Sequence, residues 1–293
     1  MFSIVTDTSA NLDTALLQQR QISVIPFHYY LDGQEQACHE LNAFDGPSYY
    51  AAMRAGHKAS TSQIPPQEYI DFFRPMLERD EDILLVSMSS GISGAYSSAC
   101  MAAHQLREEF PQRQIILVDT FSASLGEGLM VLRAADCRDQ GMSLLDTANF
   151  LNELRYHMCQ VFTVGDLKYL RAAGRLSNLA SMLGIALHIK PLLKGNEEGK
   201  IVGFGKVIGR EKSIRALAEQ YDAYVQDAGA QIVGIAHGDC PKDAALLAEL
   251  LNRNAPPREI MTVCYEPVTG AHVGPGTLAL FFFGDKSFRT AKH

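Results

Sequence analysis

Short apolar runs alternate with helix-like stretches through the first half of the chain. The runs lie at 2–7, 22–27, 83–86 and 115–118, and apolar residues at helical spacing follow most of them. Strands and helices that alternate at this rhythm form mostly parallel sheets with helices on both faces. The pattern therefore predicts an α/β fold for this half of the chain.

The pattern changes near residue 160, where glycines begin to interrupt short apolar runs. A helix is expected at 177–187 and a hairpin at 200–207, while a polar loop at 267–276 separates the last two expected strands. We therefore predict two α/β domains. Residues 1–160 form a mostly parallel sheet with helices on both faces, and residues 161–293 form a smaller mixed α/β domain.

Composition narrows the function classes. Of the 293 residues, 47% are hydrophobic, which suffices for a substantial core, and the net charge of −7 argues against a general affinity for nucleic acid. The apolar stretch at 278–283 is far shorter than the roughly 20 residues that cross a bilayer. Because the N-terminus also lacks the basic stretch of a signal peptide, we expect a cytoplasmic protein without stable membrane insertion. The six cysteines stand singly, which disfavours a metal site.

One junction of strand and helix has the composition of an anion-binding site. The apolar run at 83–86 leads into a loop of serines and glycines at 87–94, and small helix formers follow it. The first turn of a helix offers free N–H groups and a partial positive charge, and Ser93 adds a hydroxyl donor. The alternative is that a serine here only caps the helix.

Two further loops carry polar side chains that suit a carboxylate. Thr61 and Ser62 stand in one of them, and His272 lies between glycines in the other. If the sheet brings Thr61 and Ser62 to the same edge as Ser93, the three hydroxyls form a cluster of uncharged donors where open α/β sheets commonly bind ligands. For His272 the alternative is an ordinary structural histidine.

A serine hydrolase is a competing interpretation of the same residues. The segment from Gly91 to Ala95 nearly matches the nucleophile elbow G-x-S-x-G around Ser93, and Asp239 and His272 follow in the order of a triad. The match fails at its last glycine, which is Ala95 here. Without an activating base a serine hydroxyl is a poor nucleophile but a good hydrogen-bond donor.

Seven motifs in a fixed order give the chain a family resemblance. They are Val5 to Leu12, Thr61-Ser62-Gln63, Ser90 to Tyr96, Val118-Asp119-Thr120 with Ala123, Ser124 and Gly126, Asp166 to Leu170 with Gly174-Arg175-Leu176, Lys190-Pro191, and His272 to Leu278. Over this span the chain resembles the DegV family of fatty-acid-binding proteins. The resemblance implies two α/β domains with one long-chain fatty acid, such as palmitate, in a tunnel between them and no other cofactor.

The resemblance also implies roles for individual residues. Thr61 and Ser93 hydrogen-bond the carboxylate, with Ser62, Gly94 and His272 close by. Residues 1–160 carry these loops, and residues 161–293 cover the acyl chain. The candidates for the tunnel wall are the apolar side chains of Ile185, Leu187, Ile189 and Leu192, for which ordinary core packing is the alternative.

By the same resemblance the chain is a carrier rather than an enzyme. It resembles the binding subunit of a bacterial fatty acid kinase, whose separate ATP-binding subunit phosphorylates the presented carboxylate for phospholipid synthesis. Arg171, Arg175 and Arg210 are the candidates for docking that partner. One departure counts against the partnership, because Ile208 stands where many relatives have a basic residue.

Overall fold

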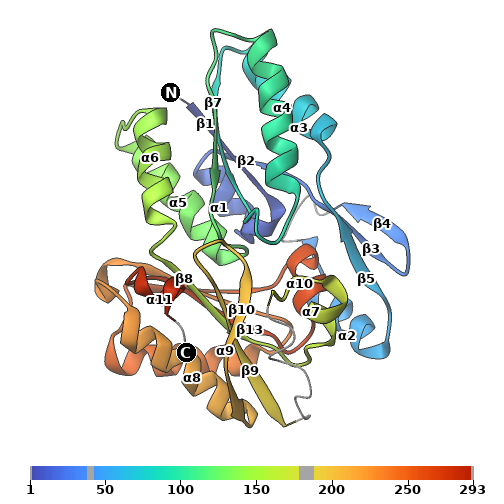
Figure 1. The fold of residues 1–293 in the computed structure, drawn as a ribbon, viewed down its shortest axis with the longest axis vertical. Helices are drawn as coiled ribbons and strands as arrows, with labels where there is room; N and C mark the ends of the chain where they lie inside the picture. Colours follow the sequence, from blue (N-terminus) through green and yellow to red (C-terminus); the bar gives the residue numbers. More distant parts are fainter. Residues whose placement is uncertain (1, 38–42, 178–187, 292–293) are drawn as a thin grey trace.

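The computed structural model describes residues 2–37, 43–177 and 188–291, which form two stacked lobes (Figure 1). The upper lobe is built on a parallel sheet with the strand order β2-β1-β6-β7. Its strands are β1 (Phe2–Asp7), β2 (Ile22–Ile25), β6 (Asp82–Ser87) and β7 (Ile115–Asp119). The predicted parallel α/β sheet is thereby confirmed.

Helices cover both faces of this parallel sheet, because its strands are apolar on both sides. Ile4 and Leu84 point into one core cluster, while their neighbours Val5 and Leu85 point into another. The Val5 side packs against α3 and α4, and the Ile4 side against α5 and α6. The helices are α1 (Thr14–Gln19), α3 (Pro66–Glu78), α4 (Ala95–Glu109), α5 (Leu125–Asp139) and α6 (Leu144–Leu154), with a 3-10 turn η1 (Thr8–Ala10).

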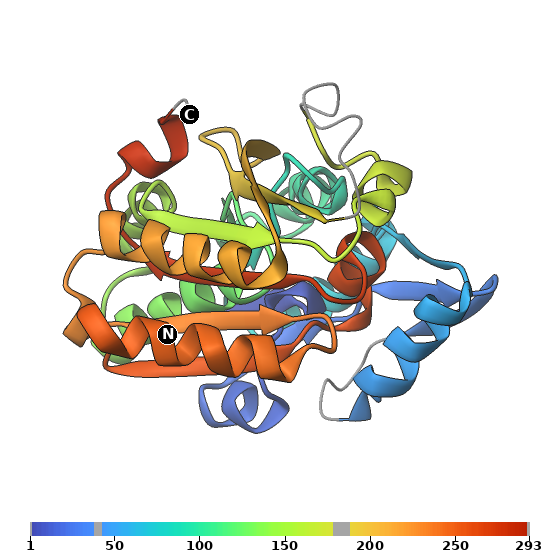
Figure 2. The same ribbon diagram turned by 90° about the horizontal axis from the view of Figure 1, so that it is seen from below.

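The lower lobe contains a mixed sheet with the strand order β10-β9-β8-β13-β11-β12, in which only β11 and β12 pair in parallel. The strands are β8 (Met158–Thr163), β9 (Ile189–Gly195), β10 (Ile201–Ile208), β11 (Ile232–His237), β12 (Glu259–Cys264) and β13 (Leu278–Phe283). α8 (Arg210–Tyr224) and α9 (Pro241–Asn254) lie side by side on its outer face (Figure 2). The expected hairpin at 200–207 is β9-β10, with Glu198-Gly199 in its turn.

Helix α5 belongs to the cores of both lobes. It packs against β1 and β6 of the parallel sheet and also against β8, β11 and β13 of the mixed sheet. Gly234 of β11 allows this approach, because a Cβ there would lie only 2.8 Å from Leu125 Cβ. The two sheets therefore meet along one shared helix, and α5 positions what lies between them.

A third, antiparallel sheet lies beside the lobes. It has the order β4-β3-β5 and consists of β3 (His28–Leu31), β4 (Gln34–Ala37) and β5 (Ala59–Ser62), accompanied by α2 (Gly46–Ala55). Asp32 and Gly33 form the turn between β3 and β4, and both have positive φ. β5 was missed because it is short and polar.

The expected polar loop at 267–276 is wrong in its first part, which forms α10 (Pro267–Val273). Glu266 caps this helix, because its carboxylate accepts the N–H groups of Val268 and Thr269, and Pro267 occupies the first turn. The expected helix at 177–187 lies almost wholly outside the described residues. The remaining short helices are α7 (Lys168–Ala173), η4 (Ala228–Ala230) and α11 (Ser287–Thr290). Within the described ranges no helix has the length and apolar character to cross a membrane.

Candidate functional site

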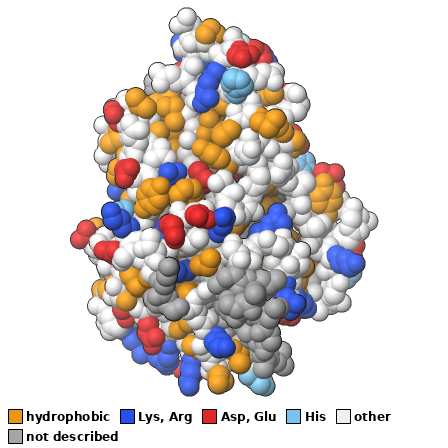
Figure 3. Space-filling view, viewed as in Figure 1, with side chains coloured by type: hydrophobic (Ala, Val, Ile, Leu, Met, Phe, Trp, Pro, Cys, Tyr) orange, Lys and Arg blue, Asp and Glu red, His pale blue; other side chains and the backbone are white. Residues whose placement is uncertain are grey.

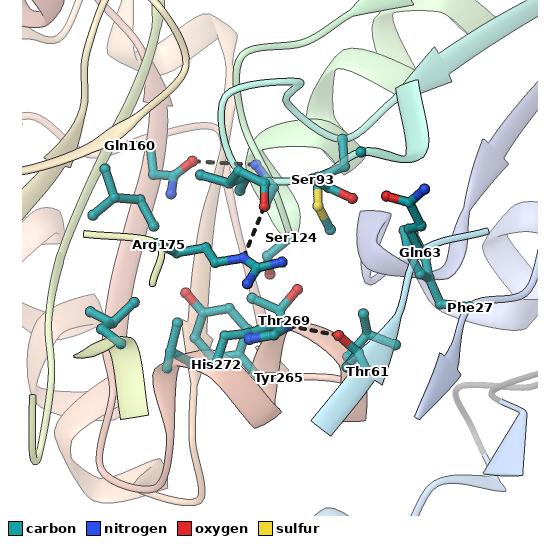
Figure 4. A pocket seen from close by; sticks show the side chains of 18 of the residues that line it. Phe27, Thr61, Gln63, Ser93, Ser124, Gln160, Arg175, Tyr265, Thr269 and His272 are labelled. Atoms are coloured by element: carbon teal, nitrogen blue, oxygen red, sulfur yellow. Dashed lines mark hydrogen bonds between the residues drawn. The ribbon is translucent and has the colours of Figure 1, made fainter. Parts of the chain in front are cut away.

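A cavity of about 120 Å³ lies where the three sheets meet, and three separate segments bring the expected carboxylate-binding residues to it (Figure 4). β5 contributes Thr61 and Ser62, the loop after β6 contributes Ser93 and Gly94, and α10 contributes His272. All five residues that the family resemblance implied for the carboxylate thus line one cavity. It lies at the carboxyl end of β6, the position in which open α/β sheets commonly hold ligands.

The loop after β6 presents Ser93 as a hydroxyl donor. Its Oγ accepts the N–H of Ala95 at 3.2 Å, as in a helix cap, which leaves the hydroxyl proton to donate elsewhere. Gly94 comes next in the chain, and a Cβ at this position would overlap Oε1 of Gln63. Glycine at 94 thus leaves room for the Gln63 side chain, and Ser93 and Thr61 line the same cavity.

Thr61 and His272 form the second polar contact of the cavity. Thr61 Oγ1 lies 2.8 Å from His272 Nε2, although the two residues are 211 positions apart in the chain. Burial, and secondarily the charge of Arg175, lowers the pKa of His272 to about 4. The imidazole is therefore neutral at physiological pH. Toward Thr61, its Nε2 either donates or accepts one hydrogen bond.

Further polar groups in the cavity escaped the sequence analysis. Thr269 Oγ1 is buried and has no hydrogen-bond partner among the described residues, although it lines the cavity. Gln160 on β8 accepts hydrogen bonds from Ser122 Oγ at 2.7 Å and Ala123 N at 3.3 Å through its Oε1. No motif marked either residue, because Thr269 and Gln160 are ordinary polar residues in the sequence. Only the folded helix and strand turn them into the cavity.

Apolar side chains from both lobes form much of the rest of the cavity wall. They include Phe27, Phe162, Leu170, Ile201 and Val273. Of the predicted tunnel residues, Ile185 and Leu187 lie outside the described residues. Ile189 and Leu192 stand on β9, where Leu192 packs into the core cluster under α8. Neither is among the described residues that line this cavity.

The predicted docking arginines occupy three different environments. Arg175 is exposed yet also lines the cavity, where its Nε donates to Ile92 O at 3.2 Å. Arg171 is exposed on α7. Arg210 begins α8 and pairs with Asp243 at 2.8 Å. Figure 3 shows several basic side chains on the seam between the lobes, interspersed with acidic ones.

The residues of the hydrolase alternative are not assembled as a relay. His272 Nε2 contacts Thr61 instead of Ser93. Asp239, the expected acid, pairs with Arg54 of α2. Among the described residues, moreover, no group of His, Cys, Asp and Glu side chains has the arrangement of a metal site. The geometry supplies donors for an anion, and it does not supply the activated serine that hydrolysis needs.

Buried carboxyl groups link β1 and the turn after it to α5. Ser9 Oγ lies within hydrogen-bond distance of the carboxyl groups of both Asp7 and Glu127, and Thr6 Oγ1 donates to Glu127 at 2.9 Å. Burial raises the pKa of Asp7 to about 6 and that of Glu127 well above its usual value. The same cause raises the pKa of Glu266 to about 7. The opening motif around Asp7 therefore acts by anchoring α5 to β1.

Comparisons with known proteins agree with this architecture. A family model described as "Uncharacterised protein, DegV family" matches residues 1–285. A DegV domain-containing protein of Clostridium perfringens is 33% identical over 284 residues, which cover 97% of this chain and 98% of that protein. A relative from Streptococcus pyogenes is 34% identical and covers 98% of this chain and 99% of its own length.

Solved structures extend the similarity to the fold. A DegV family protein from Thermus thermophilus, described with fatty acid binding, superposes with a TM-score of 0.87 at 28% identity, covering 97% of this chain and 99% of that one. A fatty acid binding DegV family protein from Streptococcus agalactiae gives a TM-score of 0.85 at 28% identity with the same coverage. The predicted fold class is confirmed by these structures.

Proposed function

The chain belongs to the DegV family, and on this premise we propose that it binds a long-chain fatty acid between its lobes, with the carboxylate at Thr61 and Ser93. The observation that carries the proposal is the composition of the cavity. Uncharged donors gather at one corner, and Phe27, Phe162 and Val273 form an apolar wall beside it. This combination suits a ligand with a polar head and a hydrocarbon body. The fatty acids described for the related structures are consistent with it.

The hydrogen bonds at the corner favour an anionic head group. Ser93 has its hydroxyl proton free because its oxygen already accepts from Ala95 N. When neutral His272 carries its proton on Nε2, it donates to Thr61 Oγ1, and the Thr61 hydroxyl then points its own proton at the ligand. Ser62 and Thr269 add hydroxyls to the same wall, and Gly94 leaves room for the head group.

Burial of the hydrocarbon chain supplies most of the affinity. Each methylene that leaves water contributes about 0.8 kcal/mol, so a long chain binds tightly with few polar contacts. Hydrogen bonds to a charged group add about 1.5 to 3 kcal/mol each and fix which end of the lipid faces Thr61. We assign residues 161–293, with Phe162, Leu170, Ile201 and Val273, to the cover of the acyl chain. The undescribed Ile185 and Leu187 remain candidates for that cover, as do Ile189 and Leu192 on β9.

The carrier presents its carboxylate to a separate ATP-dependent fatty acid kinase subunit, and the acyl phosphate enters phospholipid synthesis. Support for this step comes from Arg175, which is exposed and lines the cavity, so that the head group lies next to a surface arginine. Arg171 and Arg210 extend the basic character of this partner-docking set. Ile208, 68% exposed on β10, contributes an apolar side chain there instead of a charge.

The lipid-binding step is tested by native mass spectrometry of the purified protein. We expect a bound fatty acid, and we expect the double variant Ser93→Ala with Thr61→Ala to lose it. The matched control is Ser97→Ala with Ser60→Ala, because Ser97 and Ser60 are exposed neighbours of the two donors. Wild-type protein that stays empty after incubation with palmitate would refute the proposal. Labelling of Ser93 by a fluorophosphonate would favour a hydrolase instead.

The kinase step has its own readout. Protein loaded with palmitate is mixed with a candidate ATP-binding subunit, and acyl phosphate is trapped as the hydroxamate. Arg175→Gln should reduce product formation while palmitate remains bound, since that residue is placed at the partner-facing side. If loaded protein yields no acyl phosphate with any such subunit, the carrier role stands and the kinase role falls.

A further inference from the structure

A second cavity of about 270 Å³ lies farther along α5 than the first. Its wall includes Leu129, Leu132 and Asp136 of α5, whereas the first cavity touches this helix only at its cap, Ser124. The two cavities share no lining residue among those that the structure describes. The second cavity is thus a separate site in the seam between the lobes.

Apolar side chains from both lobes form the floor of this second cavity. Leu129 and Leu132 of α5 are 3% and 6% exposed, and Leu154 ends α6 beside them. Ile232 and Phe283 face them from β11 and β13 of the mixed sheet. Atoms that line an unfilled space lose dispersion contacts, so this floor favours a ligand with an apolar body.

The rim of the second cavity carries an arginine without a carboxylate partner. Arg258 is exposed, and its side chain makes no hydrogen bond or ion pair to any residue that the structure describes. Arg133 lies 3.6 Å from Asp136, whose carboxylate is held more closely, at 2.7 Å, by Arg20. Arg258 is therefore available to an incoming anion, and Arg133, which also lies 6.0 Å from the centroid of the Phe150 ring, is held only loosely by Asp136.

Two further ionisable groups, His157 and Asp227, lie at the rim. His157 donates from Nδ1 to Gly284 O at 2.9 Å when that nitrogen is protonated. Asp227 is an exposed acid on the same rim, and its positive φ of 48° belongs to the turn after α8. Arg20 pairs with both Asp136 and Asp139, and Arg138 also pairs with Asp139. With Arg133 and Arg258, the arginines around this rim outnumber its acids, and it has a net positive character.

We propose that this second cavity binds a compact organic carboxylate with an aromatic or branched apolar body. The carboxylate pairs with Arg258 and Arg133, because a planar guanidinium matches a carboxylate with two parallel hydrogen bonds. The apolar body lies between Leu132 and Phe283. Since the walls come from both lobes, the ligand bridges them and stabilises their association along α5.

The probe for this site is 4-bromobenzoate, which has a carboxylate on a flat apolar ring and a bromine that anomalous diffraction locates. We expect a bromine peak between Leu132 and Phe283 in soaked crystals, and saturable binding in solution by calorimetry. Arg258→Gln should weaken that binding about ten- to hundredfold, the loss expected for hydrogen bonds to a charged group. The control Arg253→Gln, on exposed α9, should leave it unchanged.

A second variant tests the floor independently of the rim. Leu132→Trp fills the cavity and should abolish the calorimetric signal, while bound palmitate in the first cavity persists. The proposal is overturned by bromine found only in the first cavity, by binding at crystal concentration only, or by affinities that Arg258→Gln leaves unchanged. Because the readout does not use the fatty acid, its failure is distinct from failure of the lipid-binding proposal.

Discussion

The two cavities along α5 differ in how their polar groups carry charge. The first uses the hydroxyls of Thr61 and Ser93 and a histidine whose pKa of about 4 keeps it neutral. The second has the guanidinium groups of Arg133 and Arg258 at an exposed rim. A full charge is costly in a buried wall when no ligand is present, whereas an exposed rim holds it at little cost. Arg175, which also lines the first cavity, is exposed too, so the buried donors are uncharged and the charged ones stand at exposed edges.

The largest effect should come from placing a charge in the neutral corner. Ser93→Asp puts a carboxylate against the carboxylate of the lipid and also removes a donor. We expect palmitate affinity to fall more than about 1,000-fold, because a buried unpaired charge costs several kcal/mol. Equilibrium binding measures it, with Ser97→Asp as the control. Ser97 is exposed in the first turn of α4, where an added acid is favourable. Retained binding by Ser93→Asp would place the head group elsewhere.

Removal of a single neutral donor should have an intermediate effect. Thr61→Val keeps the shape of the side chain but deletes the hydroxyl between His272 and the ligand. Loss of one hydrogen bond to a charged group predicts about a ten- to hundredfold weaker binding of palmitate. Ser60→Val is the matched control, since the neighbouring residue of β5 is exposed. Equal affinities of the two variants would show that Thr61 does not touch the carboxylate.

A substitution in α5, the helix along which both cavities lie, should alter the stability of the fold rather than ligand binding. The pKa of Asp7 is raised from 3.8 to about 6, so its contribution to stability is complete below 3.8 and is lost as pH rises through about 6. The pKa of Glu127 is also raised, so its contribution to stability has the same sign. Glu127→Gln removes one of these titrations. The free energy of unfolding of this variant should therefore fall less than that of the wild type as pH rises from about 5 to about 8.

Denaturant unfolding at the two pH values measures this difference. His272 contributes with the opposite sign, since its lowered pKa makes stability fall as pH drops from 6.5 through about 4. That contribution is common to both proteins and cancels in the comparison. Palmitate affinity at neutral pH should be the same in both. Parallel pH profiles of the two proteins would mean that Glu127 is ionised in the fold.

A change in salt concentration should have the smallest effect on binding. It should distinguish recognition by exposed charges from recognition by uncharged donors. Raising the salt from about 0.05 to about 0.5 M screens exposed charges and should weaken 4-bromobenzoate binding at Arg258 about threefold. Binding of palmitate should change less than about twofold, because its affinity rests mainly on burial of the hydrocarbon chain and its expected donors Thr61 and Ser93 are uncharged, although Arg175 also lines this cavity. Parallel titrations at both salt concentrations measure this. Equal salt dependence at the two cavities would contradict the distinction.

The sequence predicted those parts of the fold whose residues act locally. β1, β6 and β7 are apolar runs that need no partner to be recognised. The hydroxyl motifs around Thr61 and Ser93 were likewise visible as short segments. α10 escaped because its start depends on one buried carboxylate, Glu266, inside a stretch that otherwise has the composition of a loop.

What the sequence could not predict depends on contacts between distant segments. Thr269 and Gln160 become part of the first cavity only because α10 and β8 turn them inward. The second cavity joins residues from α5 to the end of β13, and none of its positions belongs to a motif. No local pattern records such an arrangement, because each side chain is ordinary until the mixed sheet packs on α5.

The contact between Thr61 and His272 also determines when the head-group corner can form during translation. The two residues are 211 positions apart, and Arg289 ties the last helix to Phe121 O and Asn196 O still later in synthesis. The upper sheet can form early, because β1, β2, β6 and β7 all precede residue 120. The head-group corner cannot close until translation has passed His272. A nascent chain therefore carries an incomplete corner until His272 has emerged, well after the strands of the upper sheet are complete.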